Sequence, residues 1–296
     1  MIGSVVLSSL SSKGWHFRPD LGKVETEPKI IKVKQGGGGD FATVMKAIDS
    51  VPADSKNMPN LMFDATVKEY GIVGSATLTT LSNYFVGAYL TIANSAPKHD
   101  GKRAGAQAVA LRVSGDRSAF YGCNKFSFQD TLCDDRGNHF FKDCYIRGTV
   151  DFILEVGNLY IWLDSEIFVE IDPKLTVITA QARESSSEDI GYSFVHGKIT
   201  GTANGSFLVR AWKSSPRVVY VYTKMTNVVN PAGWSHEIQP ERAKTVYHGE
   251  YKWTGVGAYS SGREPFAKQL TQKEAEPFLS LDYVNATKWL LPAPKI

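Results

Sequence analysis

Two aspartates, Asp130 and Asp151, lie 21 residues apart in stretches that resemble each other. A shift of that size superposes Phe120 on Phe141, Cys123 on Cys144 and Asp130 on Asp151. The period is too short for a strand–helix–strand unit but fits one turn of a solenoid, in which equivalent residues of successive turns stack. Since neighbouring strands lie about 4.7–4.9 Å apart, the two carboxyl groups are expected to face each other. One can then attack a bond while the other handles its protons.

The repeat extends in both directions. Gln107 precedes Gln129 by 22 residues, and three residues continue the ladder 21 residues after Phe141, Cys144 and Asp151: Trp162, Ser165 and Asp172. Four successive turns are therefore expected. The segments between them are short and rich in β-forming residues, without a helix-period stripe. The sequence thus predicts an all-β fold.

Length and composition agree with a single solenoid domain. The chain has 296 residues, of which 43% are hydrophobic and 21% charged, so it can bury a large core. The formal net charge is +3, and Lys and Arg are scattered rather than massed. This pattern predicts no nucleic-acid partner but permits an anionic polymer. No segment is typical of a membrane span, so no membrane partner is expected.

Cysteines and histidines predict neither a metal site nor a cofactor. Cys123, Cys133 and Cys144 form no C-x-x-C pair. Cys123 and Cys144 are expected to stack on adjacent turns, either as two buried thiols or as a disulfide. The histidines are isolated from one another. Serine-elbow, H-E-x-x-H and P-loop signatures are absent, which leaves the carboxylate pair as the candidate catalytic group.

The amino-terminal third contains a leader-like segment and a competing motif. Residues 1–26 are expected to be an atypical or truncated secretion signal, since the apolar run has no basic leader. Ile30–Val33 is typical of a strand, glycines follow, and Asp40 can cap a helix. That layout also matches dinucleotide-binding folds. Because alternating helices are missing downstream, the helix is expected to cap the solenoid formed by residues 27–296.

Four ordered segments resemble the motifs of plant pectin methylesterases, or pectinesterases: Gln107–Arg112, Phe128–Leu132, Gly148–Ile153 and Leu208–Trp212. The similarity runs from about Ser75 to the carboxyl terminus. It implies a single-stranded right-handed parallel β-helix of the pectin-lyase type, with an N-terminal capping helix and a C-terminal tail of helices and loops. It also implies a monomeric, secreted ester hydrolase that acts on methyl-esterified homogalacturonan in the plant cell wall. A proteinaceous pectinesterase inhibitor is one candidate partner.

The resemblance also implies a role for each site residue. Asp151 is the expected nucleophile, which attacks the ester carbonyl and forms an acyl-enzyme. Asp130 is expected to give a proton to departing methanol and then to activate water. Arg210 is the expected cation beside Asp151, so that the two carboxyl groups differ in pKa. Gln107 and Gln129 are expected to stabilise the oxyanion.

Four residues are expected to contact the substrate: Thr77, Gln107, Arg210 and Trp212. Trp212 can offer a flat apolar face to a sugar ring. Trp234 either does the same or belongs to the core. Thr77 aligns with a threonine that the family uses at the substrate.

The chain departs from the family pattern in three places. Between Asp54 and Ser75 it is shorter, which predicts a missing coil and an exposed apolar face unless Leu61–Ile72 covers it. Glu155 replaces a glycine and adds a negative charge near the carboxyl groups. Val209 also replaces a glycine, and a β-branched residue adopts positive φ only at a cost, so a required positive φ would displace Arg210.

These departures leave two main interpretations of function open. The first is an active pectinesterase, and the second is a degenerate, non-catalytic relative that at most binds pectin. A β-helix polygalacturonase or lyase, which would cut the polymer, is a further alternative. Methanol release distinguishes the first from the others.

Overall fold

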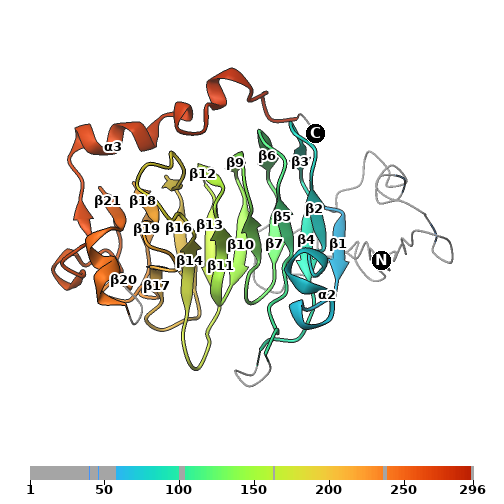
Figure 1. Ribbon diagram of the computed structural model, residues 1–296, viewed down its shortest axis with the longest axis horizontal. Coiled ribbons are helices and arrows are strands. Elements are labelled where there is room, and N and C mark those ends of the chain that lie inside the picture. The colour runs from blue at the N-terminus through green and yellow to red at the C-terminus, as the bar shows by residue number, and fades with distance from the viewer. Residues whose placement is uncertain are drawn as a thin grey trace, which may run out of the picture.

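A computed structural model of the chain describes residues 40, 46, 58–99, 104–162, 164–235 and 239–294. Its strands wind into a coil with three sheets, in which neighbouring strands run parallel. Successive coils stand side by side along the long axis of the molecule (Figure 1). The predicted all-β parallel β-helix is therefore confirmed.

Each coil contributes one strand to each sheet. The first sheet consists of β1 (Asn60–Phe63), β4 (Thr91–Asn94), β7 (Asn124–Phe126), β10 (Tyr145–Gly148), β13 (Glu166–Val169), β16 (Lys198–Gly201) and β19 (Lys224–Met225). The second consists of β2 (Leu78–Thr80), β5 (Leu111–Val113), β8 (Leu132–Asp134), β11 (Val150–Glu155), β14 (Val177–Gln181), β17 (Phe207–Arg210) and β20 (Trp234–Ser235). The third consists of β3 (Val86–Ala88), β6 (Ser118–Tyr121), β9 (Asn138–Lys142), β12 (Asn158–Trp162), β15 (Tyr192–Val195), β18 (Arg217–Val221), β21 (Tyr247–Tyr251) and β22 (Lys268–Gln269).

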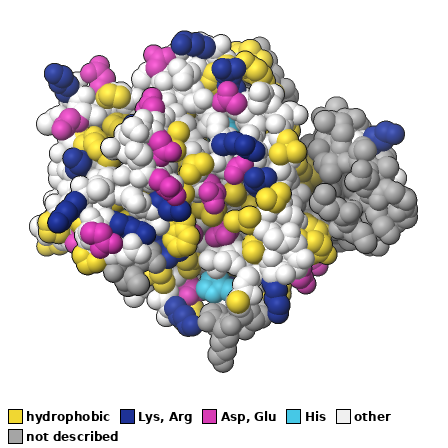
Figure 2. Space-filling view, viewed as in Figure 1, with side chains coloured by type: hydrophobic (Ala, Val, Ile, Leu, Met, Phe, Trp, Pro, Cys, Tyr) yellow, Lys and Arg dark blue, Asp and Glu magenta, His cyan; other side chains and the backbone are white. Residues whose placement is uncertain are grey.

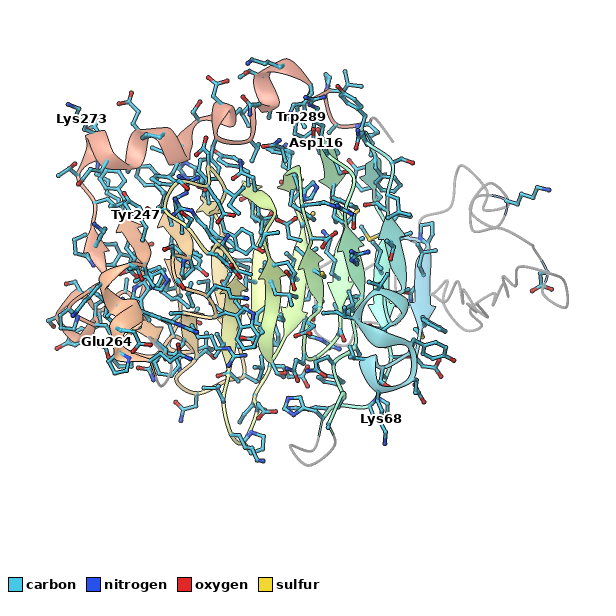
Figure 3. The ribbon with its side chains drawn as sticks, viewed as in Figure 1. Lys68, Asp116, Tyr247, Glu264, Lys273 and Trp289 are labelled. Atoms are coloured by element: carbon cyan, nitrogen blue, oxygen red, sulfur yellow. The ribbon has the colours of Figure 1, made fainter. Side chains whose placement is uncertain are left out.

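Helices of the described part lie outside the coil. They are α2 (Val67–Gly74), η2 (Pro240–Lys244), η3 (Ser260–Gly262), α3 (Gln272–Leu279), η4 (Leu281–Val284) and η5 (Ala286–Lys288). The last three form the carboxyl-terminal tail, which runs back along the third sheet; Lys273 lies near one end of it and Trp289 near the other (Figure 3). The hydroxyl of Tyr160 donates to the Leu279 carbonyl at 2.8 Å, and that of Tyr121 donates to the Leu291 carbonyl at 2.7 Å. The predicted tail of helices and loops is thus confirmed.

Stacked side chains fill the interior of the coil. Phe120 stacks on Phe141 with ring centroids 4.8 Å apart, and Phe194 stacks on Tyr220 at 4.5 Å. The first sheet adds a buried ladder made of Leu61, Ile92, Lys125, Ile146, Ile167, Ile199 and Met225. Burial of these apolar faces is what holds successive coils in one register.

A left-handed backbone turn repeats between the third and first sheets. Seven successive coils use one residue with φ between 47° and 57° at this corner: Tyr89, Gly122, Asp143, Asp164, His196, Tyr222 and Lys252. Such angles are costly for residues other than glycine, so the surrounding structure must impose them. Part of that structure is the backbone ladder, in which the Tyr222 amide donates to the Tyr251 carbonyl at 2.9 Å.

The observed register confirms part of the predicted ladder and corrects the rest. Phe141 lies opposite Phe120, as expected. Ile161, not Trp162, lies opposite Phe141. Paired residues of β9 and β12 are thus 20 positions apart in the sequence, one fewer than the predicted period. Asp172 does not stack under Asp151 either: it lies in the loop after β13, where it pairs with His99 at 3.4 Å. The coil from β11 to β14 is longer than the one before it, since Ile153 pairs with Leu132 on one side and with Thr179 on the other, and this breaks the predicted period.

The amino-terminal end is only partly described. The leader, the boundary at residues 26–27 and the helix predicted after Asp40 lie outside the described residues, apart from Asp40 and Lys46 themselves. Of the predicted cover Leu61–Ile72, Leu61 is buried in β1. Helix α2 buries none of its residues and leaves three apolar side chains exposed, Tyr70, Ile72 and Val73. Within the predicted cover, β1 therefore enters the core and α2 does not.

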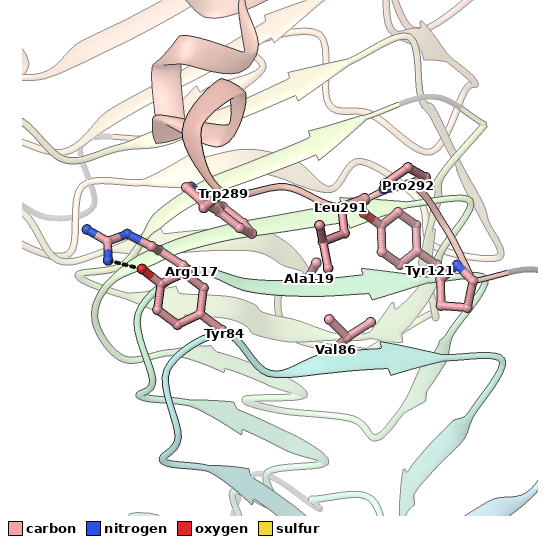
Figure 4. A pocket seen from close by; sticks show the side chains of 9 residues that line it. Tyr84, Val86, Arg117, Ala119, Tyr121, Trp289, Leu291 and Pro292 are labelled. Atoms are coloured by element: carbon pink, nitrogen blue, oxygen red, sulfur yellow. Dashed lines mark hydrogen bonds between the residues drawn. The ribbon is translucent and has the colours of Figure 1, made fainter.

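The carboxyl-terminal tail ends over a small apolar pocket on the third sheet. Residues of β3 and β6 line it together with Trp289 and Leu291. Arg117 also lines it and donates to the Tyr84 hydroxyl at 2.6 Å (Figure 4). Asp151 belongs to the second sheet, so this pocket lies apart from the carboxyl groups.

Lys125 generates a stability prediction. It is completely buried in the aliphatic ladder, where its ammonium group donates to the Cys123 carbonyl at 3.2 Å and lies 4.8 Å from the Phe141 ring centroid. Burial of a charge without a carboxylate partner is costly. Lys125→Met is therefore expected to raise the free energy of unfolding by about 1–4 kcal/mol, the gain reported when buried ion pairs are replaced by apolar residues.

Urea unfolding monitored by circular dichroism measures this change. Lys224→Met serves as the control and should change stability little, because Lys224 is exposed on β19 of the same sheet. Equal or lower stability of Lys125→Met would mean that the cation stabilises the core.

Candidate functional site

Asp130 and Asp151 lie next to each other on adjacent coils of the second sheet. Asp151 is part of β11, and Asp130 precedes β8 in the neighbouring coil. The Asp130 amide donates to the Val150 carbonyl at 3.4 Å, which sets the two aspartates at the same level. They are 6% and 4% exposed. The predicted pair of facing carboxyl groups is thus present.

Both aspartates have a left-handed backbone. The φ angle is 67° at Asp130 and 49° at Asp151. Gly148 contributes to the tight path before Asp151, because a Cβ atom there would lie 2.2 Å from the Cβ of Phe152. Positive φ at non-glycine residues persists only where the fold enforces it, and it concentrates at functional sites.

Arg210 forms a bidentate ion pair with Asp151. The guanidinium Nε donates to Oδ1 of Asp151 at 2.7 Å, and Nη2 donates to Oδ2. Arg210 ends β17, so this ion pair spans the intervening strand β14. A guanidinium in this geometry stabilises the ionised carboxylate. The cation predicted beside Asp151 is therefore in place.

The surroundings of Asp130 favour its protonated form. Burial raises the pKa of Asp130 well above its ordinary value, and the charges of Asp151 and Glu155 raise it further, while Arg210 acts in the opposite direction. Two close carboxyl groups cannot both ionise easily. The arrangement thus favours a proton on Asp130 and a charge on Asp151, which suits acid–base chemistry combined with nucleophilic attack.

Trp212 lies at the edge of this pair, whereas Trp234 does not. Trp212 is 45% exposed, and its ring lies 4.9 Å from the Arg210 guanidinium. Trp234 is completely buried and stacks on His248 with ring centroids 4.6 Å apart. Of the two alternatives for Trp234, the structure therefore supports the core position. Trp212 keeps a face available to a ligand.

Gln107 and Gln129 lie on adjacent coils, as the 22-residue spacing predicts. The amides of Ala110 and Leu111 both donate to the Thr131 carbonyl. The coil that contains Gln107 thus has one residue more at this point than the coil that contains Gln129. Before this irregularity, the Ala108 amide donates to the Gln129 carbonyl at 3.2 Å. The Gln107 side-chain oxygen is buried without a hydrogen-bond partner among the described residues.

Thr77 precedes β2 in the same sheet. Its hydroxyl donates to the Ala93 carbonyl at 2.9 Å, and its amide donates to the Val109 carbonyl at 3.1 Å. The first of these bonds fixes the side chain against the adjacent backbone. Its contact with substrate stays a prediction.

Val209 and Glu155, which replace glycines of the family pattern, differ in backbone conformation. Val209 is a buried residue of β17 opposite Thr179 and Trp234, and it is not among the described residues with positive φ. The condition under which Arg210 would be displaced is therefore not met. Glu155 does have positive φ, 88°, at the end of β11. Its side chain is half-buried; burial and Asp135 raise its pKa, and Lys213 and Arg112 lower it.

Within the described ranges, no three His, Cys, Asp or Glu side chains are grouped to hold a metal ion. Cys123, Cys133 and Cys144 are buried and unpaired. No helix in the described part combines the length and apolar character needed to cross a membrane.

On the face seen in Figure 2, acidic and apolar side chains lie together near the middle, and Lys and Arg side chains flank them.

Sequence reasoning missed Arg242. Its guanidinium Nη1 donates to the carbonyl oxygens of Ala211 and Trp212, at 2.9 Å in the latter case. An arginine that binds backbone carbonyls belongs to no motif, and 30 residues separate it from Trp212. The sequence offered no signal for this contact.

A parallel β-helix with two buried aspartates on adjacent coils, one of them bound by an arginine, is the arrangement that the resemblance to pectinesterases implied. Comparison with known families identifies it further, since the Pectinesterase model matches residues 62–287. The chain belongs to the pectinesterase family and is a carboxylic ester hydrolase.

Individual pectinesterases are similar to this protein over most of its length. "Putative pectinesterase 63" of Arabidopsis thaliana is 44% identical, over 88% of this chain and 86% of that protein. "Pectinesterase 1" of Olea europaea is 43% identical, over 93% of this chain and 83% of that protein. The solved pectin methylesterase from carrot is 29% identical and superposes with a TM-score of 0.73, covering 86% of this chain and 92% of that one.

The strained angle at Glu155 leads to a stability prediction. Glu155→Gly should raise the free energy of unfolding by about 1–3 kcal/mol, because glycine adopts φ of 88° without strain. Glu155→Ala removes the same charge but keeps the strain, so it is the matched control. Urea unfolding should rank Gly above Ala, and equal stability of the two variants would contradict a strained backbone.

Proposed function

We propose that the chain removes methyl esters from homogalacturonan, giving pectate and methanol, with Asp151 as nucleophile and Asp130 as acid and base. The observation that carries this proposal is the Arg210–Asp151 ion pair beside the buried Asp130, whose pKa is raised by burial and by the charge of Asp151. It supports an active enzyme over the degenerate alternative, since none of the three groups is lost or displaced.

The reaction follows from this arrangement. The Asp151 carboxylate attacks the ester carbonyl carbon and forms an anhydride with the enzyme. Asp130 gives its proton to the departing methoxide oxygen, which leaves as methanol. Asp130 is then a carboxylate and takes a proton from water. The resulting hydroxide attacks the anhydride, which releases the acid and regenerates Asp151 and protonated Asp130.

The remaining side chains are proposed to stabilise charge and to bind sugar. Gln107 and Gln129 would donate amide hydrogens to the tetrahedral oxyanion, a type of contact worth about 3–4 kcal/mol per donor in another hydrolase. Trp212 would stack against a galacturonate ring, with Arg210 beneath it. Thr77 is proposed as a further contact to the polymer.

The setting of the reaction is also a proposal. Methyl-esterified homogalacturonan is a polymer of the plant cell wall, so we propose that the protein is secreted there and acts as a monomer. A proteinaceous pectinesterase inhibitor stays a candidate partner. Asn204 and Asn285 are exposed and begin Asn-x-Ser/Thr sequences, which is compatible with passage through the secretory pathway.

Methanol release from esterified pectin tests the proposed roles. Asp151→Ala should abolish it, and Asp130→Asn should slow it by about 10²–10⁴, the usual contribution of a positioned acid–base group. Asp189→Asn, at an exposed surface position, serves as the control and should behave as wild type. Folded wild-type protein that releases no methanol would contradict the proposed esterase activity. A fall in pectin viscosity without methanol release would indicate cleavage of the polymer instead.

The pH dependence of kcat tests the acid role of Asp130. Only protonated Asp130 can donate to methanol, so activity should fall as pH rises through its pKa. Glu155→Gln removes one charge that raises this pKa. The alkaline limb of the profile should therefore move to lower pH in this variant, and it should stay in place in the exposed control Glu184→Gln. A shift to higher pH, or no shift, would contradict the assignment.

A further inference from the structure

Arg242 binds the backbone on which Trp212 is presented. It lies in η2, and its guanidinium Nη1 donates to the carbonyl oxygens of both Ala211 and Trp212. A single side chain thus holds two successive peptide groups of the segment that follows β17. These contacts are to backbone, so Arg242 touches neither of the carboxyl groups.

The segment itself is sharply folded. The Trp212 amide donates to the Arg210 carbonyl at 2.8 Å, and the Ala211 amide donates to the Ser235 carbonyl at 2.9 Å. The amides of Ala211 and Trp212 are therefore hydrogen-bonded to backbone carbonyls, and Arg242 donates to the carbonyl oxygens of the same two residues. A turn with all of these backbone groups paired has little freedom to move.

A rigid connection links Arg242 to the third sheet. The Arg242 carbonyl accepts hydrogen bonds from the amides of Thr245 and Val246, at 3.0 and 3.1 Å. The Thr245 hydroxyl in turn donates to the Ser214 carbonyl. Val246 is followed directly by β21, which pairs with β18. The position of Trp212 is thus fixed from two sheets, the second through β17 and the third through η2.

The consequence for the site follows from the contact between Trp212 and Arg210. The Trp212 ring lies against the same guanidinium that binds both oxygens of Asp151. A shift of the turn would move the ring away from its place beside the nucleophile. Misplacement by about 1 Å is enough to cost a large factor in rate.

We propose that Arg242 is a positioning residue of the esterase site, which orients Trp212 to bind the sugar ring of a methyl-esterified polyuronide next to Asp151. The inference rests on the proposed function of Trp212 and Asp151. It adds to that function a residue that acts through the backbone and never contacts the substrate.

Steady-state kinetics on esterified pectin tests this inference. Arg242→Met keeps the length of the side chain but removes its donors, and it should raise KM roughly ten- to a hundredfold with a smaller loss of kcat. Arg242→Lys keeps a charged donor and should recover part of the loss. Arg217→Met, a partly buried arginine that pairs with Asp189, is the control and should leave KM unchanged.

Two further measurements separate positioning from a general loss of structure. In a Trp212→Ala background, Arg242→Met should have no further effect on KM, because its target is gone. Independent, multiplicative effects of the two changes would overturn the inference, as would an unchanged KM in Arg242→Met.

Acrylamide quenching of tryptophan fluorescence gives a readout that does not need activity. The Trp212 contribution, obtained by subtracting the matching Trp212→Phe protein, should become more accessible in Arg242→Met. If wild type released no methanol, the proposed function would fail while this measurement still decided the role of Arg242. Unchanged quenching of Trp212 would then reject it.

Discussion

The bidentate ion pair between Arg210 and Asp151 is the interaction on which the rest of the site depends. Two carboxyl groups forced together by the stacking of coils would compete for one proton. The guanidinium decides the outcome, since it favours the ionised form of the group that it binds. Burial and the charge of Asp151 raise the pKa of Asp130, which favours its protonated form.

The ion pair is possible only because the coils stay in register. Arg210 stands on β17 and Asp151 on β11, so the guanidinium must reach across β14. On β14, Thr179 pairs with Val209, the residue that precedes Arg210. Aromatic and aliphatic ladders inside the solenoid hold this alignment. The charges of the site are therefore placed by the alignment of the apolar core.

The cost of the arrangement is visible in the backbone. Asp130, Asp151 and Glu155 all adopt positive φ within two neighbouring coils. For the two aspartates the unusual angle accompanies the facing carboxyl groups. At Glu155 it accompanies a charge that raises the pKa of Asp130. The residue is thus a source of strain and at the same time an electrostatic contributor to the acid.

Much of the fold and the centre of the site could be predicted from the sequence. The 21-residue spacing predicted the facing aspartates because the offset between β8 and β11 is set by equal coils without insertions. The same spacing failed for Trp162 and Asp172, because the next coils differ in length and a ladder cannot be extrapolated across a loop of unknown size. The opposition of Gln107 and Gln129 depended on an irregularity at Ala110, which the 22-residue spacing already reflected.

Other features left no trace in the sequence pattern. The hydrogen bonds of Arg242 go to backbone carbonyls, which any residue supplies, so no side-chain motif marks them. Lys125 interrupts an aliphatic ladder, and its burial could not be inferred from a residue type that is normally exposed. Displacement of Arg210 depended on a positive φ at Val209, an angle that the residue type does not reveal and that the structure does not show. Local geometry, rather than residue identity, decided each of these cases.

The central claim is that Asp130 carries the proton while Asp151 is ionised. Carbon-13 NMR titration of the aspartate carboxyl groups in the folded protein tests it most directly. A resonance that titrates well above the ordinary range for aspartate should vanish in Asp130→Asn, and in Asp151→Asn it should titrate at lower pH because a neighbouring charge is gone. Ordinary titration of Asp130, or a resonance unaffected by Asp151→Asn, would contradict the account.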